Sequence, residues 1–487
     1  MIRNGKKKAI SCALVAAMSV GLAACGTTSY DFKVSYDGIK TGDVSSKVSV
    51  HDPSILKADG EYYIFGSHMS AAKSSDLLNW EKVADGYSKK NPVYGQIYDV
   101  ADEAFAYSGS KNSLIKTDDK QVHVWAPDVI YNETTGLYYM YYCTTSTWNA
   151  SNLCYGTSTT PEGPYEWQGA LIYSGFNRKT ISGTDVLDYV DEDYAYKNYI
   201  KGAQYNYEDY PNAIDPTVFY DADGRMWMVY GSWSGGIFLL EIDKTTGLVI
   251  HPEADKANNV DPYYGKRLLG GGHISIEGPY IMYDEASGYY YLFVSYGALT
   301  SNGGYQVRVF RSKTVDGEYV DMNGKYPEKS AQHQNFGLKL TGNYKLPSLE
   351  KAYMATGHNS AFVDDDGRMY LVYHTRFNDN GEGHSPRVHQ MLVNEDGWPC
   401  ELPYQTQGET VNKDGYDTDD IIGRYYVINQ GTAIDSKIAN PVILYLEKNG
   451  KVKGEKSEGT WECKDGSYYM NITIDGKKYS GVFCQMK

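Results

Sequence analysis

The sequence has too few basic residues for a nucleic-acid-binding protein. Lys and Arg number 46 against 61 Asp and Glu, which gives a formal net charge of -15. Such a surface would repel a phosphate backbone, so we expect no nucleic-acid partner. Neither a Walker A pattern nor a His-Glu-x-x-His motif occurs, which argues against nucleotide and zinc-protease chemistry. A neutral polysaccharide remains compatible with this charge.

Cysteine is also scarce. Of the seven cysteines, Cys12 and Cys25 lie near the N-terminus, and five follow. An odd number excludes a complete disulfide framework, and no spacing is typical of a zinc site. Two pairings are open, 143 with 154 and 463 with 484, but free thiols are the simpler expectation. The five later cysteines are Cys143, Cys154, Cys400, Cys463 and Cys484.

Beyond the N-terminus the sequence has no apolar run long enough to span a bilayer. The first 24 residues combine basic residues with an apolar run from Ala9 to Ala24, a pattern that predicts an export signal. The run ends Leu-Ala-Ala-Cys25, which resembles a lipoprotein lipobox. We therefore predict a signal peptide at 1–24, a linker at 25–44 and a cell-surface lipoprotein or extracellular protein. A plain signal or an uncleaved anchor is the alternative.

Tyrosine and glycine, by contrast, are abundant. The 48 Tyr and 50 Gly favour short strands joined by tight turns over long helices. Five segments repeat one pattern of an apolar strand, an Asp/Gly turn and a strand rich in Tyr and Trp. They start at His51, Trp125, Ile214, Ile276 and Gly357.

The repeats predict a five-bladed β-propeller at residues 45–405. We align them at Pro53, Pro127, Pro216, Pro279 and Ser360, with spacings of 63 to 89 residues. Each spacing leaves room for about four strands, as in a propeller blade. An ordinary β-sandwich is the alternative, although it does not explain the repeated frame. The fold class is therefore all-β.

A second, smaller domain is predicted at residues 410–487. Its residues alternate in polarity and include Asn-Gly and Asp-Gly turns, which are typical of β-hairpins. We expect an antiparallel, barrel-like β domain. It holds no convincing catalytic set, so we interpret it as a packing or binding accessory.

Three carboxylates are predicted to meet at one end of the propeller axis. The first strand of each blade lines the central channel, so residues that start these strands lie close together. Asp52 and Asp215 directly precede aligned prolines, and Glu277 stands one residue before Gly278 in the fourth repeat. A following proline disfavours helical backbone, so we expect both aspartates to be extended.

These carboxylates suit glycoside hydrolysis, which needs one protonated acid and one ionised carboxylate. We assign Asp52 as the general base. Glu277, in an apolar context, is assigned as the general acid with a raised pKa. Asp215 would keep Glu277 protonated and orient it. Acids from different blades favour the wider, inverting arrangement.

Sugar recognition requires aromatic faces near the acids. Trp125, Trp148, Trp233 and His273 are the candidate substrate-binding residues. For any one Trp, packing between blades is the alternative. The Tyr-rich insert at 177–211 could wall an open groove.

The carboxylate motifs resemble glycoside hydrolase family 43. "HDPS", "NAIDPTVF" and "SIEGPYI" are similar to its base, modulator and acid motifs, and "ATGHNSAF", "YHTRF", "RVHQMLVNEDGWP" and "YSGVF" resemble its extracellular endo-1,5-α-L-arabinanases. The resemblance implies a five-bladed propeller, inversion, and cleavage of internal α-1,5 linkages in plant cell-wall arabinan. One departure is Gly278, where many relatives would have Ala.

The resemblance also implies a calcium ion. In those arabinanases a channel histidine binds Ca²⁺ that is largely surrounded by water, and His358 matches it; a hydrogen-bonded channel histidine is the alternative. We expect a monomer that contacts the membrane only through its lipid anchor. Two other functions stay open: an exo-acting α-L-arabinofuranosidase or β-xylosidase, and a non-catalytic surface glycan-binding lipoprotein.

Overall fold

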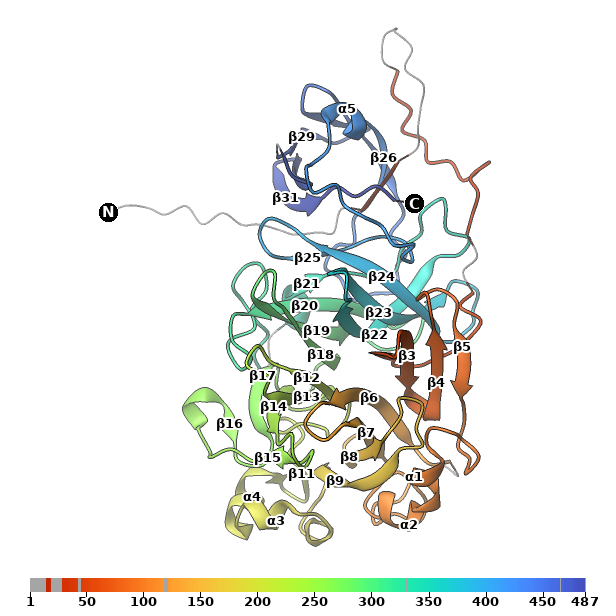
Figure 1. Ribbon diagram of the computed structural model, residues 1–487. Coiled ribbons are helices and arrows are strands. Elements are labelled where there is room, and N and C mark those ends of the chain that lie inside the picture. The colour runs from red at the N-terminus through yellow and green to blue at the C-terminus, as the bar shows by residue number, and fades with distance from the viewer. Residues whose placement is uncertain are drawn as a thin grey trace, which may run out of the picture.

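The computed structural model describes residues 15–18 (backbone only), 29–42, 45–117, 121–329, 332–464 and 466–486. The predicted cleavage and lipidation at Cys25 lie outside these residues. The chain forms five separate antiparallel sheets followed by a C-terminal sheet (Figure 1). This confirms the predicted all-β class, with a five-bladed propeller and a small C-terminal β domain.

The first two blades each have four strands in chain order. Blade 1 comprises β2 (Ser54–Ala58), β3 (Glu61–Gly66), β4 (Ser70–Ser74) and β5 (Glu81–Ala84). Blade 2 comprises β6 (Val124–Asn132), β7 (Leu137–Thr145), β8 (Ser151–Ser158) and β9 (Glu166–Ser174).

Blade 3 is extended by short strands at its outer edge. It comprises β12 (Thr217–Tyr220), β13 (Met226–Tyr230), β14 (Ile237–Ile242), β15 (Val249–Ile250), β16 (Val260–Asp261) and β17 (Gly265–Leu269). Blade 4 comprises β18 (Ile276–Asp284), β19 (Tyr289–Tyr296), β20 (Gln306–Ser312) and β21 (Leu338–Lys339). Blade 5 comprises β22 (Tyr353–Val363), β23 (Met369–Phe377), β24 (Ser385–Val393) and β25 (Pro399–Glu401).

The blades close into a ring around one axis. Each first strand contacts the next, in the order β2, β6, β12, β18 and β22, and β22 contacts β2 again. Figure 1 shows the blades following one another in chain order around this centre. Buried apolar side chains form five clusters, one at each junction between neighbouring blades. The apolar core therefore lies between the sheets and leaves the axis to polar groups.

Short helices and one hairpin occupy the loops. The α-helices are α1 (Gly95–Asp99), α2 (Ala101–Ala104), α3 (Val186–Tyr189), α4 (Glu192–Asn198) and α5 (Thr418–Ile421). The 3-10 turns are η1 (Ser67–Met69), η2 (Ile181–Gly183), η3 (Lys256–Asn258) and η4 (His333–Asn335). The hairpin is β10 (Ile200–Lys201) with β11 (Gln204–Tyr205). None of the described helices is long and apolar enough to cross a bilayer.

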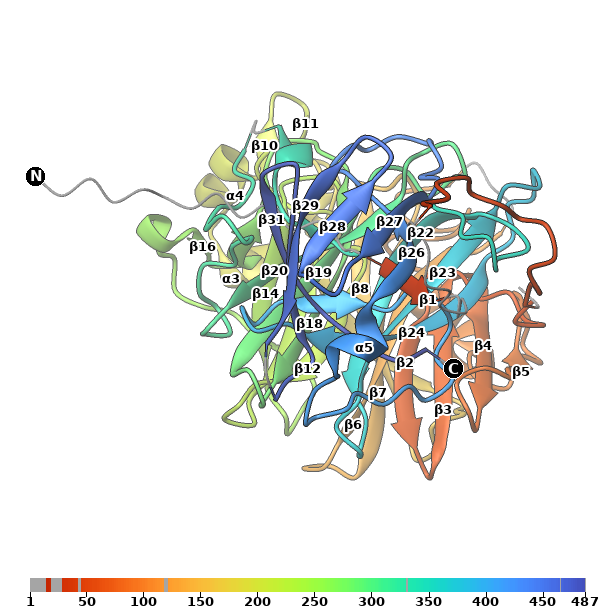
Figure 2. The ribbon, with the colours of Figure 1, turned by 90° about the horizontal axis from the view of Figure 1, so that it is seen from above.

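The C-terminal sheet is a curled antiparallel meander beside β21 and β25 (Figure 1). Its strands are β26 (Gly423–Ile428), β27 (Val442–Leu446), β28 (Lys451–Gly454), β29 (Glu458–Cys463), β30 (Tyr469–Ile474) and β31 (Lys477–Val482). From above, these strands lie over the propeller (Figure 2). The segment β1 (Val15–Met18) pairs with β26 at the sheet's edge.

Part of the predicted linker contacts this sheet. The ring of Tyr30 lies 5.0 Å from that of Tyr445, and Phe32 lies 5.7 Å from the same ring. The Arg424 guanidinium donates to the carbonyl of Lys33 at 2.8 Å. All five cysteines after the N-terminal segment are free, as expected.

Candidate functional site: a carboxylate cluster on the propeller axis

In each blade, one residue at or just before the first strand has left-handed backbone. The register of three first strands shifts at this place, which marks a β-bulge. In blades 2, 4 and 5 a bulge turns this residue out of the pleat, and in blades 1 and 3 the residue two positions before the first strand has the same left-handed backbone. The five positions are therefore structurally equivalent. They are Asp52 (φ 56°), Ala126 (42°), Asp215 (56°), Gly278 (55°) and His358 (47°).

The extended backbone expected for Asp52 and Asp215 is wrong. With φ of 56°, both lie in the left-handed region, which non-glycine residues seldom occupy. The following proline disfavours right-handed helix but does not decide between extended and left-handed backbone, and each aspartate takes the left-handed form two residues before its strand begins. Such backbone costs about 1–3 kcal/mol per residue and occurs preferentially at functional sites.

The alignment of the fifth repeat also needs a correction of one residue. Gly357 pairs with His374 and Ser360 with Val372, so the two bulged residues are His358 and Asn359. Asn359, and not Ser360, therefore takes the place of the prolines. His358 is consequently the counterpart of Asp52 and Asp215.

Asp52 is held as an anion by basic and hydroxyl groups. Its Oδ1 lies 3.0 Å from Nε2 of His51 and 3.1 Å from Nδ1 of His358, and its Oδ2 accepts from the Ser67 hydroxyl at 2.5 Å. Burial alone would raise the pKa of Asp52, but His358, His51 and Ser67 together lower it to about 2. An ionised carboxylate is what a general base requires.

Asp215 has the opposite electrostatic character. Its Oδ2 accepts from the backbone N–H of Gly278 at 3.1 Å, which ties blade 3 to blade 4. Burial raises the pKa of Asp215 to about 7; His358 opposes this shift, while the charges of Glu277 and Asp52 add to it. Asp215 therefore gains and loses its proton near neutral pH.

Glu277 receives hydrogen bonds at both carboxylate oxygens. The Tyr305 hydroxyl donates to Oε1 at 2.7 Å, and Oε2 accepts from the Trp233 indole N–H at 2.5 Å and from the Ser232 hydroxyl at 3.2 Å. Burial raises the pKa of Glu277, and the bonds from Tyr305 and Trp233 only partly offset it. The charge of Glu277 raises the pKa of Asp215, and the charge of Asp52 raises the pKa of Glu277, so neighbouring carboxylates favour protonation at both sites.

His358 lies among the three carboxylates. Its backbone N–H donates to the Ser295 hydroxyl at 2.7 Å. Burial works against its charged form, but Asp52, Asp215 and Glu277 raise the pKa of His358 above its ordinary value. A Cβ at Gly278 would lie 3.1 Å from Nδ1 of His358, so glycine leaves room for this ring.

Aromatic rings lead outward from Glu277. The Trp233 ring lies 5.5 Å from that of exposed His273, and His273 lies 5.9 Å from exposed Tyr207. Tyr207 belongs to the 177–211 insert, where the carbonyl of Glu208 accepts from the N–H of Gly272 at 2.7 Å. Tyr207 of the insert therefore forms one aromatic rim with Trp233 and His273, although sequence reasoning did not single out Tyr207.

The two remaining tryptophans differ from each other. Trp125 packs against the apolar cluster between blades 2 and 3, so its ring contributes to the junction. Trp148 is 72% exposed. Its neighbour Asn149 lies 3.3 Å from the Ser234 hydroxyl, which brings the Trp148 loop to the Trp233 loop. Trp148 is therefore open to solvent beside the Trp233 loop.

The profile of the glycosyl hydrolases family 43 matches residues 44–209 and 191–399, and that of a C-terminal lipocalin-like domain, GH43_C, matches 403–487. The chain belongs to this family. It is 37% identical to the extracellular endo-α-(1→5)-L-arabinanase 2 of Bacillus subtilis, covering 90% of this chain and 88% of that protein. It is 39% identical to the extracellular endo-α-(1→5)-L-arabinanase of Thermotoga petrophila, covering 87% and 84%.

Solved structures agree with this family 43 assignment. The endo-1,5-α-L-arabinanase of Thermotoga petrophila aligns with a TM-score of 0.76 at 38% identity, covering 91% of this chain and 93% of that one. A family 43 glycoside hydrolase of Bacillus licheniformis aligns with a TM-score of 0.76 at 37% identity, covering 90% and 92%. The similarity thus includes both the propeller and the C-terminal domain.

A calcium ion at His358 would take most of its ligands from water. Ca²⁺ prefers six to eight oxygen ligands. Near His358, Oδ2 of Asp52 and both oxygens of Glu277 already accept hydrogen bonds. The protein can therefore supply one imidazole and few carboxylate oxygens, which fits an ion whose other ligands are water.

A different histidine group is the one metal-capable cluster among the described residues. The ligand atoms of His51, His374 and His384 lie within 4.8 Å of one another. His374 is fully buried; its Nδ1 accepts from the Asp52 N–H at 3.3 Å, and its Nε2 has no partner. His358 is not a member of this cluster.

Several residues of the family 43 site were missed by sequence reasoning. His51 directly precedes Asp52, so the dipeptide itself was a usable signal. Ser67 and Tyr305 come from a turn and a loop with no such signal. Asp128 is a further buried axial acid, but it lies outside the carboxylate cluster: its carboxylate accepts from the Ser54 hydroxyl and, at 2.6 Å, from the Val218 N–H.

Proposed function

We propose that this family 43 protein is an exported endo-1,5-α-L-arabinanase that inverts the anomeric centre. The observation that carries the proposal is the divergence of two carboxylates in one cluster. The pKa of Asp52 is lowered to about 2, whereas that of Glu277 is raised. A pair of titratable groups pushed in opposite directions provides a base and an acid at the same pH. The names of the relatives supply the substrate, arabinan.

In this mechanism Asp52 accepts a proton from the water that attacks the anomeric carbon, and Glu277 donates its proton to the departing glycosidic oxygen. The bond between that oxygen and the anomeric carbon breaks as the bond from water forms. Asp215 acts on Glu277 through its charge: once Asp215 is ionised, its negative charge favours the protonated form of Glu277. Because the N–H of Gly278 donates to Asp215, the strand that carries Glu277 is fixed relative to this charge.

A leaving-group experiment tests the acid role. Glu277→Gln should lose about 10²- to 10⁴-fold in kcat on debranched arabinan, because general acid catalysis contributes this much. The loss should be smaller on an arabino-oligosaccharide with a dinitrophenyl leaving group, which needs no proton. Asp128→Asn, which changes a buried axial acid outside the cluster, is the matched control. An equal loss on both substrates would contradict the assignment of Glu277.

Endo action is proposed from the exposed aromatic rim. Trp233, His273, Tyr207 and Trp148 could hold several sugar units beyond the cleaved bond. Size-exclusion analysis of early products from linear arabinan should show mid-length oligosaccharides before short ones. Release of single arabinose units or dimers from the start would favour the exo-acting alternative. Binding without any release of reducing ends would favour the glycan-binding lipoprotein.

Calcium, retention of the anchor and export are parts of the same proposal. His358 would hold a hydrated Ca²⁺, which would add positive charge beside the carboxylates; no step above depends on it. Chelation should lower the melting temperature as well as activity, and added Ca²⁺ should restore both. Cys25→Ser should move the protein from the membrane fraction to the medium. The relatives are named extracellular, which supports export.

A further inference from the structure

Tyr305 reaches Glu277 from a loop of blade 4. It lies directly before β20, and its hydroxyl donates to Oε1 of Glu277 at 2.7 Å. The side chain is 1% exposed. Its ring stacks with that of His374 at 5.9 Å, and a Cβ at Gly357 would lie 2.3 Å from the ring. Blade 5 therefore fixes the ring, and only the hydroxyl reaches the acid.

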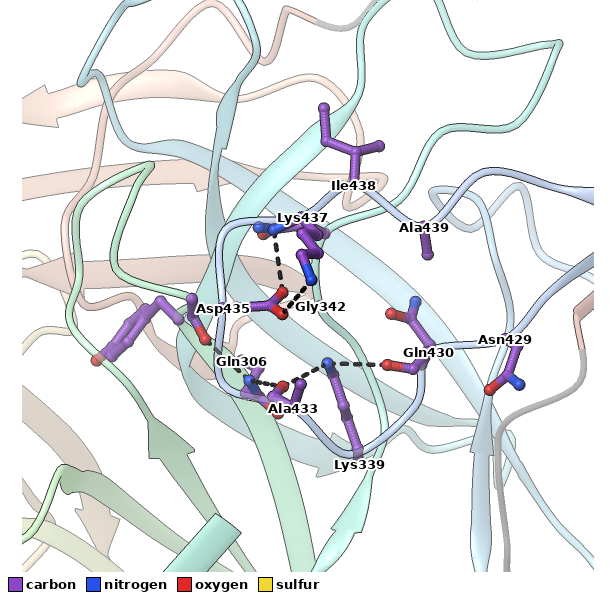
Figure 3. Close-up of a pocket in the computed structure, with 13 residues that line it drawn as sticks. Gln306, Lys339, Gly342, Asn429, Gln430, Ala433, Asp435, Lys437, Ile438 and Ala439 are labelled. Atoms are coloured by element: carbon purple, nitrogen blue, oxygen red, sulfur yellow. Dashed lines mark hydrogen bonds and ion pairs between the residues drawn. The ribbon is translucent and has the colours of Figure 1, made fainter.

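The backbone on both sides of Tyr305 is held by a segment of the C-terminal domain, residues 429–439. The Gln306 side chain donates to the carbonyl of Ala433 at 3.0 Å and to that of Gly304 at 2.9 Å (Figure 3). A Cβ at Gly304 would lie 2.6 Å from the backbone nitrogen of Asp435. The segment thus touches the residues immediately before and after Tyr305.

Two cationic side chains of blade 4 also bind the same segment. Nζ of Lys339 donates to the carbonyls of Gln430 at 3.1 Å and Ala433 at 3.3 Å (Figure 3). Nη2 of buried Arg308 donates to the carbonyl of Thr432 at 2.5 Å. These are charge-assisted bonds from strands of the propeller to backbone of the C-terminal domain.

The contact beside Tyr305 is incompletely filled. A cavity of about 200 Å³ lies between blade 4 and segment 429–439, and Tyr305 is among its lining residues. Ile434 and Ala439 of the segment pack against apolar clusters of the propeller on either side of this cavity. At the cavity itself, the hydrogen bonds from Gln306 and Lys339 connect the Tyr305 backbone to the C-terminal segment.

We propose that Tyr305 is a positioning residue for Glu277, and that segment 429–439 of the C-terminal domain holds Tyr305 in place. The inference rests on the proposed role of Glu277 as general acid. It gives the C-terminal domain a part in catalysis without any residue of that domain touching the substrate. The Tyr305 hydroxyl fixes the plane of the carboxyl group and limits the rise of its pKa, since the hydrogen bond favours the ionised form.

Tyr305→Phe tests the first half of the proposal. We expect kcat on debranched arabinan to fall about 10- to 100-fold with little change in KM, because a misplaced catalytic group costs this much. The alkaline limb of the pH profile should move to higher pH, because Glu277 loses a bond that lowered its pKa. Tyr296→Phe removes a buried hydroxyl without a hydrogen-bond partner and is the matched control. An alkaline limb unchanged from wild type in Tyr305→Phe would overturn the positioning role.

A double-mutant cycle tests the second half. Lys339→Met removes the bonds to Gln430 and Ala433 and should shift the alkaline limb in the same direction, by less. Combined with Tyr305→Phe, it should have almost no additional effect on kcat, because residues that act through one contact are not additive. Lys437→Met, on the same cavity but 88% exposed at its side chain, is the control. Fully additive losses would refute the link to the C-terminal domain.

The two proposals fail in different ways. Full activity of Glu277→Gln on arabinan would remove the acid role itself. Loss of activity in Glu277→Gln together with an unshifted profile in Tyr305→Phe would leave the acid role standing and remove only the positioning role.

Discussion

The propeller and the C-terminal domain place their apolar side chains differently. In the propeller, apolar clusters occupy the five junctions between blades, and the axis holds buried polar groups such as Asp52, Asp215 and His358. In the C-terminal domain one apolar cluster, including Trp461 and Met470, fills the inside of the curled sheet.

This difference shows why catalysis belongs to one domain and support to the other. A ring of sheets satisfies its hydrophobic burial at the junctions, so its centre can carry charged groups that hold each other in place. A single curled sheet has only one interior and needs it for its core. Substitutions should therefore separate chemistry from stability according to the domain in which they are made.

The largest effect is expected at the axis. Asp52→Asn should lower kcat about 10²- to 10⁴-fold, because the base is lost while its shape and the Ser67 contact are kept. That loss corresponds to about 2.7–5.5 kcal/mol of activation free energy. Initial rates on debranched arabinan measure it, and thermal unfolding should show a folded protein. Activity within a few-fold of wild type would remove Asp52 from the mechanism.

In the C-terminal domain a substitution should lower stability more than activity. Trp461→Ala removes a buried ring and its N–H bond to the carbonyl of Glu447, at 2.9 Å, and should lower the free energy of unfolding by about 3–5 kcal/mol. Denaturant unfolding measures this loss. Well below the melting temperature, kcat should stay near wild type while segment 429–439 remains attached. A large fall in kcat in a fully folded variant would break the separation.

Asp215 should show that the axis is arranged for chemistry at the expense of stability. Its folded pKa is raised from 3.8 to about 7, so the folded state binds more protons than the unfolded state between these values. The free energy of unfolding therefore falls as pH rises from about 4 to 7.

Asp215→Asn should remove this dependence and stabilise the protein at pH 8 by about 1–4 kcal/mol while it abolishes most activity. Melting temperatures measured from pH 4 to 8 test the slope. An unchanged slope in the variant would mean that another group causes it. Asp128→Asn, whose parent also has a pKa raised to about 7, separates a general effect of burial from one specific to the cluster.

The fold and the three acids could be predicted because local sequence patterns indicate them. Each repeat carries its own strand, turn and aromatic strand, and each axial acid stands beside a proline or glycine at the same place in its repeat. The backbone of Asp52 could not be predicted in this way. Proline disfavours right-handed helix at the residue before it, but it does not select the left-handed backbone that Asp52 adopts two residues before β2.

The partners of the acids were less accessible than the acids themselves. Tyr305 reaches Glu277, 28 residues away, only because β19 and β20 return along the blade. The aromatic track through His273 to Tyr207 joins two loops that the sequence separates by an entire blade. Contacts of this kind depend on tertiary geometry, for which one sequence offers no periodicity or spacing.

The smallest effects are expected where N-terminal residues contact the C-terminal sheet. This sheet has an open edge, whereas the propeller ring is closed. Because processing before Cys25 would remove β1, a chain starting at residue 26 should match the full chain in activity and differ by less than about 0.5 kcal/mol in stability. A chain starting at residue 45 also loses the contacts of Tyr30, Phe32 and Lys33 with the C-terminal sheet. Those aromatic contacts and hydrogen bonds are worth about 1–3 kcal/mol together, so its melting temperature should fall. Thermal unfolding of both chains makes the comparison. Equal melting temperatures would mean that residues 26–44 act only as a tether. Loss of stability in the chain starting at residue 26 would mean that β1 belongs to the folded domain.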